Sequence, residues 1–99
     1  MNVTIPQAQI AEICRRHHIR KLSVFGSILR DDYRAESDVD VLAEFEADFN
    51  PGWEIVDLAD ELGRTFSNRH VDVVNPKYLN RWLRDEILAT AQVVYEAEG

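Results

Sequence analysis

A Gly-Ser pair followed by two closely spaced aspartates strongly limits what this chain can fold into. Gly26 and Ser27 follow the apolar run Leu22–Phe25, so the pair is expected where a strand ends and a short helix begins. The first backbone N–H groups of a helix lack internal partners and carry the positive end of its dipole, and glycine lets an anion approach the main chain. This junction is therefore a candidate phosphate site, to which the Ser27 hydroxyl can add a donor.

Aspartates mark the two strands expected after that junction. Asp38 and Asp40 begin an alternating run that ends at Phe45, and the period of two sends both carboxylates to one face. Asp72 lies within the β-branched run His70–Val74, where an isolated charge would be costly on a buried face. Because Mg²⁺ takes carboxylate and phosphate oxygens, these acids predict a magnesium site that handles a nucleoside triphosphate. Three acids could hold the two metal ions of a nucleotidyl-transfer site.

The rest of the chain alternates helical and strand patterns. Thr4 and Gln7 form a possible capping box for the first helix, and Asn50 can cap the helix that starts at Pro51. The expected elements are a helix from about Ile5, a strand over Lys21–Phe25, a short helix from Gly26 to about Tyr33, a loop over Arg34–Ser37, a strand over Asp38–Phe45, a helix from Pro51 through Phe66, a strand over His70–Val74, a helix over Leu79–Ile87 and an extended segment over Val93–Tyr95.

Gly26, Ser27, Asp38, Asp40 and Asp72 together match the signature of the DNA polymerase β-like nucleotidyltransferases. The chain most resembles the minimal nucleotidyltransferases of that superfamily, both in length and in the order of its elements. The resemblance implies an α/β (α+β) fold, in which a small mixed β-sheet is flanked by helices as in the palm of polymerase β-like nucleotidyltransferases. It covers nearly the whole chain, so a single domain over residues 1–99 is expected.

Many minimal nucleotidyltransferases are antitoxins of HEPN/MNT toxin–antitoxin pairs. The resemblance implies a Mg²⁺-dependent enzyme that transfers AMP from ATP to a hydroxyl, a tyrosine in those pairs, of a partner HEPN ribonuclease and so neutralises it. A hetero-oligomer with the toxin and two Mg²⁺ ions are expected. Two alternatives remain open: a homodimer that modifies small molecules of the antibiotic type, and a non-catalytic antitoxin that binds its toxin sterically. Three intact acids argue against the second, since a binding module has no need to concentrate them.

Each signature residue has an expected role. Asp38 and Asp40 would hold one metal ion, and all three aspartates would share a second that activates the acceptor hydroxyl. Asp72 is the candidate general base. The Gly26 N–H group and Ser27 would retain the β and γ phosphates.

Charged residues beside the signature have two possible roles. Arg30, one turn into the predicted helix, could contact a triphosphate or pair with nearby acids. Asp31 and Asp32 stand where relatives often carry a small residue, and they bring negative charge toward a site that must receive a polyanion. Either these two acids point outward or Arg30 and Arg34 offset them.

Composition excludes several classes of function. Eleven basic residues against eighteen acidic ones give a net charge of −7, which argues against a broad grip on DNA or RNA. The chain has no long apolar run and no signal-peptide pattern, so neither a membrane span nor export is predicted, and a cytoplasmic location is expected. Cys14 is the single cysteine and is expected to be a buried helix residue.

Aromatic and histidine side chains suggest more ordinary roles. His17 and His18 are adjacent, so on a helix they point about 100° apart and cannot chelate one metal ion together. Both are expected to be solvated. Aromatic residues at helical or strand spacing are more often in the core than on a partner surface. The aromatic residues expected in the core are Trp53, Tyr78, Trp82 and Tyr95.

Overall fold

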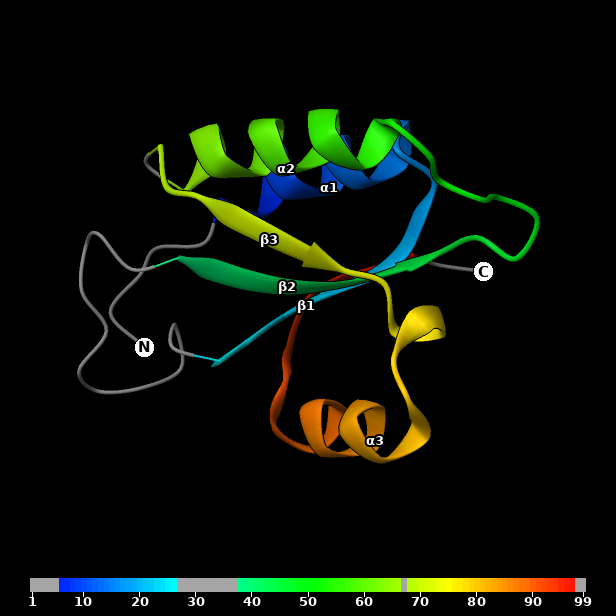
Figure 1. Ribbon diagram of the computed structural model, residues 1–99. Coiled ribbons are helices and arrows are strands. Elements are labelled where there is room, and N and C mark those ends of the chain that lie inside the picture. The colour runs from blue at the N-terminus through cyan, green and yellow to red at the C-terminus, as the bar shows by residue number, and fades with distance from the viewer. Residues whose placement is uncertain (1–5, 27–37, 67, 98–99) are drawn as a thin grey trace.

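The computed structural model describes residues 6–26, 38–66 and 68–97 (Figure 1). Within these ranges the elements, in chain order, are α1 (Gln7–Arg16), β1 (Ile19–Phe25), β2 (Val39–Phe45), α2 (Glu54–Thr65), β3 (Val71–Val74), the 3₁₀ turn η2 (Pro76–Tyr78), α3 (Arg81–Thr90) and β4 (Gln92–Glu96). The predicted α/β (α+β) class is confirmed. Beyond Gly26, the predicted short helix and the loop over residues 34–37 lie outside the described residues.

The four described strands form one mixed sheet in the order β3-β2-β1-β4. β1 pairs antiparallel with β2 and β4, whereas β2 and β3 run parallel. A parallel pair needs a crossover connection, and α2 supplies it. Figure 1 shows α1 and α2 on one face of the sheet and α3 on the opposite side. The small mixed sheet flanked by helices is therefore as expected.

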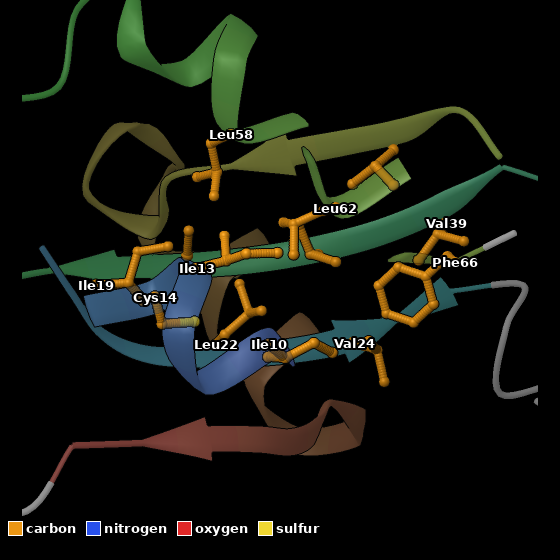
Figure 2. Close-up of a cluster of buried hydrophobic side chains, with 13 residues drawn as sticks. Ile10, Ile13, Cys14, Ile19, Leu22, Val24, Val39, Leu58, Leu62 and Phe66 are labelled. Atoms are coloured by element: carbon orange, nitrogen blue, oxygen red, sulfur yellow. The ribbon is translucent and has the colours of Figure 1, made fainter. Parts of the chain in front are cut away.

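The hydrophobic core lies between the sheet and the layer formed by α1 and α2 (Figure 2). Alternate strand residues point into it, as the pleat of a β-strand requires. Cys14 is fully buried as predicted, and burial raises the pKa of its thiol to about 12. The core comprises Ile10, Ile13, Cys14, Ile19, Leu22, Val24, Val39, Val41, Ala43, Leu58, Leu62, Phe66 and Val71.

The first helix begins later than predicted. α1 starts at Gln7, because Pro6 has a non-helical ψ of 82° and serves as the residue before the helix. Thr4, the expected cap, lies outside the described residues. Pro6 makes no side-chain hydrogen bond to the first turn, since proline offers no polar side-chain atom for one.

The second helix also begins later, at Glu54 rather than at Pro51. The Glu54 carboxylate folds back and accepts a hydrogen bond of 2.6 Å from the Gly52 N–H. Asn50 therefore does not cap α2, and Trp53 occupies the N-cap position.

The last helix, predicted to begin at Leu79, begins at Arg81. Two asparagine side chains cap separate elements here, the turn η2 and the helix α3. Asn75 accepts a hydrogen bond of 3.0 Å from the Lys77 N–H and caps η2. Asn80 accepts one of 2.8 Å from the Leu83 N–H and starts α3. The predicted final extended segment is confirmed as β4, which pairs with β1.

The prediction that the aromatic residues are in the core is wrong for three of the four. Trp53, Tyr78 and Trp82 are 89%, 72% and 81% exposed, while Tyr95 is partly buried against the core. Trp82 lies on α3, none of whose residues is buried. Spacing along one helix cannot show how closely that helix packs on the sheet. The packing of α3 buries none of its residues and so leaves Trp82 exposed.

The two adjacent histidines differ in environment. His18 is exposed as predicted, with Nδ1 3.2 Å from Glu46. The prediction for His17 is wrong: it is half-buried and contacts Glu61 of α2, which also accepts a 2.6 Å ion pair from Arg16. Burial by itself would raise the pKa of Glu61, but the hydrogen bonds from His17 and Arg16 bring it below its usual range. This cluster joins α1 to α2.

None of the helices in the described part of the chain combines the length and apolar character needed to span a bilayer.

Candidate functional site

The three signature aspartates lie within, or directly before, two neighbouring parallel strands. Asp38 immediately precedes β2, Asp40 lies within it, and Asp72 lies within β3. The register of the parallel pair places Asp40 directly opposite Asp72. Since Val39 and Val41 point into the core, strand alternation sends the aspartates to the opposite face. The structure therefore brings these acids together on the sheet face away from α1 and α2.

A histidine joins the acids. Carboxylate oxygens of Asp38 and Asp72 and a ring nitrogen of His70 all lie within 4.8 Å of one another, and all three residues are exposed. His70 Nε2 is 2.9 Å from Asp72 Oδ1. Sequence reasoning did not assign His70 to the site. Its position two residues before Asp72 on a predicted strand was the available signal, because period two puts both on one face.

Asp40 is the least exposed of the three aspartates. Its pKa is raised, first by burial and then by the negative charges of Asp72 and Asp38. The charges crowd together, so a divalent cation would relieve their repulsion. Carboxylate oxygens are the donors that Mg²⁺ prefers, and an imidazole nitrogen is compatible with several transition-metal ions. The donor set fits a divalent cation.

Gly26 places the main chain directly against Asp40. Phe25, the last residue of β1, pairs with Asp40, and Gly26 follows with a positive φ of 76°. A Cβ at Gly26 would lie 2.4 Å from Asp40 Oδ2, which only glycine avoids. The other residues predicted to contact phosphate, Ser27 and Arg30, lie outside the described residues, as do Asp31 and Asp32.

A sequence profile described as "Polymerase beta, Nucleotidyltransferase" matches residues 8–98 of the chain. The chain belongs to the polymerase β nucleotidyltransferase family. The match spans the described sheet, both flanking helix layers and all three aspartates. The predicted family is confirmed, and with it the class of enzyme: this protein is a nucleotidyltransferase.

Individual relatives agree with this assignment. A protein of Methanocaldococcus jannaschii, predicted to be a protein adenylyltransferase, is 31% identical over 91 residues, which are 92% of this chain and 96% of that protein. A solved structure of a predicted minimal nucleotidyltransferase is 30% identical, with a TM-score of 0.71 over 86% of this chain and 85% of that one. One chain in a solved complex of tri-AMPylated Shewanella oneidensis HEPN toxin with MNT antitoxin matches in fold. Its TM-score is 0.65 and its identity 16%, over 92% of this chain and 70% of that chain.

Replacing Gly26 should disturb both the fold and the acids of this nucleotidyltransferase. Gly26→Ala is expected to lower the free energy of unfolding by about 1–3 kcal/mol, because the positive φ is strained for alanine and its Cβ would collide with Asp40. Urea denaturation measures the change. Gly52→Ala is the matched control, since a Cβ there would meet Glu54 at an ordinary 3.5 Å. Equal losses in both variants would contradict this explanation.

Asp40→Asn is expected to make the metal-free nucleotidyltransferase more stable at neutral pH. Because the pKa of Asp40 is raised in the folded state, its ionised form is disfavoured there, and the penalty is present above that raised pKa. It disappears as the pH falls below 3.8, the ordinary aspartate value, where folded and unfolded states are both protonated. Urea denaturation in the presence of a chelator measures the stabilisation at neutral pH and its disappearance at acidic pH.

The control for Asp40→Asn is Asp48→Asn, which neutralises an exposed carboxylate beyond the other end of β2. This control should change stability by less than about 0.5 kcal/mol. A destabilised Asp40→Asn protein at neutral pH would show that the carboxylate supports the metal-free fold, contrary to the expectation.

Proposed function

We propose that this nucleotidyltransferase transfers AMP from ATP to a tyrosine hydroxyl of a partner HEPN ribonuclease toxin and thereby neutralises it. The observation that carries the proposal is the convergence of Asp38, Asp40 and Asp72 on one sheet face beside Gly26. Two relatives support it. The Methanocaldococcus jannaschii protein is predicted to adenylylate proteins, and the toxin in the Shewanella oneidensis complex carries AMP groups.

The position of the acids favours a protein acceptor. Asp38 and Asp72 are exposed, so a side chain on the surface of a folded partner can approach them directly. Asp40 lies deeper, against the main chain of Gly26, which is the side from which the triphosphate would enter. The acceptor and the nucleotide would then reach the same acids from different directions.

In the proposed reaction, the acceptor oxygen forms a bond to the α-phosphorus of ATP, the α–β phosphoanhydride bond breaks, and pyrophosphate leaves. Asp72 takes the acceptor proton as general base. The main chain at Gly26 would allow close approach of the phosphates, which Ser27 and Arg30 would contact. Two Mg²⁺ ions held by Asp38, Asp40 and Asp72 would neutralise the triphosphate charge and lower the pKa of the acceptor hydroxyl.

The test incubates the purified protein with Mg²⁺, ATP labelled on its α-phosphate, and a lysate of its native cells. Asp38→Asn/Asp40→Asn is the control, because it keeps the side-chain shapes and removes two carboxylates. A labelled protein band absent from the control is the expected result, and mass spectrometry of that band would identify the partner and the modified residue.

Other outcomes would replace the proposal. Label found only in a small molecule would indicate an enzyme of the antibiotic-modifying type. Absence of transfer with every nucleotide tried, together with toxin binding by an Asp38→Asn/Asp40→Asn/Asp72→Asn variant, would indicate an antitoxin that acts sterically.

A further inference from the structure

We propose that His70 is a metal ligand that sets the metal preference of this site. Together with Asp38 and Asp72 it would bind a first-row transition-metal ion, with Mn²⁺ favoured over Mg²⁺. This inference rests on the metal site of the proposed function, but it concerns the binding of the ion and not the transfer of AMP.

The spacing of the donor atoms fits a coordination site. Adjacent ligands of an octahedral ion with bonds of about 2.0–2.1 Å lie roughly 2.9 Å apart, and opposite ligands roughly 4.1 Å apart. His70 Nε2 and Asp72 Oδ1 are 2.9 Å apart, which matches an adjacent pair. Asp38 completes a group whose donor atoms all lie within 4.8 Å, so small side-chain rotations would bring all three onto one ion.

The backbone holds His70 beside the acids. The Val39 N–H donates a hydrogen bond of 2.9 Å to the His70 carbonyl, so the parallel ladder continues to the residue before β3. This bond places His70 next to Asp38, the residue that precedes Val39. The backbone from which the imidazole projects is therefore positioned by the sheet ladder.

The chemistry of the imidazole separates the candidate ions. Mg²⁺ takes oxygen ligands almost exclusively and keeps several of its waters. Transition-metal ions accept imidazole nitrogen, and Mn²⁺ accepts both imidazole and carboxylate. Asp40, which lies against Gly26, is outside the group formed by Asp38, His70 and Asp72. Because one of the three donors in this group is a nitrogen, the group should favour Mn²⁺ over Mg²⁺. This preference does not depend on the position of Asp40.

The experiment compares the unchanged protein with His70→Gln, without nucleotide and at mildly alkaline pH, where imidazole ligands are unprotonated. Mn²⁺ affinity is measured by electron paramagnetic resonance, and Mg²⁺ affinity by competition against Mn²⁺. Electron spin echo modulation from nitrogen-14 reports directly whether an imidazole binds the Mn²⁺ ion. His18→Gln is the control, since His18 is exposed and pairs with Glu46.

We expect His70→Gln to weaken Mn²⁺ binding about tenfold or more, to change Mg²⁺ binding less than about threefold, and to abolish the nitrogen modulation that His18→Gln retains. Equal weakening of both ions, or no nitrogen modulation in the unchanged protein, would overturn the proposal and leave His70 as a hydrogen-bond partner of Asp72. Neither readout depends on AMP transfer, so this inference and the proposed function can fail separately.

Discussion

Asp72→Asn is expected to reduce AMP transfer about 10³-fold or more while weakening ATP binding only a few-fold. A positioned general base contributes roughly 10²–10⁴-fold to a rate, and here the carboxylate also belongs, with Asp38 and His70, to a group of donors that could hold a metal ion. Asparagine keeps the shape of the side chain, and residue 72 is exposed, so the sheet should be undisturbed. Single-turnover assays with labelled ATP measure transfer, and calorimetry measures nucleotide binding.

The comparison with Asp38→Asn makes this prediction specific. Asp38 belongs to the pair expected to hold the triphosphate-bound metal ion, so its replacement should impair both transfer and ATP binding. Asp48→Asn, an exposed carboxylate beyond the far end of β2, should impair neither. If Asp38→Asn and Asp72→Asn lose the same amount of ATP binding, the division of roles between these aspartates is wrong.

Leu62→Ala is expected to lower the free energy of unfolding by about 2–5 kcal/mol. Leu62 is fully buried on the face of α2 that packs on the sheet (Figure 2), and its truncation leaves a cavity. Small proteins have a total stability of about 5–15 kcal/mol, so the loss would be a large share of the whole. Urea denaturation followed by circular dichroism measures it.

The matched control is Val56→Ala, on the same helix but 61% exposed. It should cost no more than about 0.5 kcal/mol. Because α2 connects the two parallel strands that carry Asp40 and Asp72, a loosened helix should also weaken metal binding. A similar loss of stability in both variants would mean that α2 does not form the core seen in the structure.

Much of the candidate site could be predicted from local patterns. The alternation around Asp38 and Asp40 fixed their common face, and the β-branched neighbours of Asp72 placed it on a strand. The structure then set these acids on neighbouring strands with Asp40 opposite Asp72. That pairing depends on a parallel register formed by segments far apart in the chain, which no local period encodes.

His70 shows where sequence reasoning was incomplete. Its spacing from Asp72 was visible, but its closeness to Asp38 comes from the ladder between β2 and β3. His17 shows the same limit, since its contact with Glu61 depends on how α1 packs against α2. In both cases the partner lies on another element.

The sequence by itself determined the family, the order of the described elements and the sides of the strands on which the acids lie, because a motif and a period are properties of single segments. The tertiary structure decided the register that sets Asp40 opposite Asp72, the inclusion of His70, and the exposure of Trp53 and Trp82. These features depend on packing between distant segments, where burial and hydrogen bonding choose among arrangements that the local sequence allows equally.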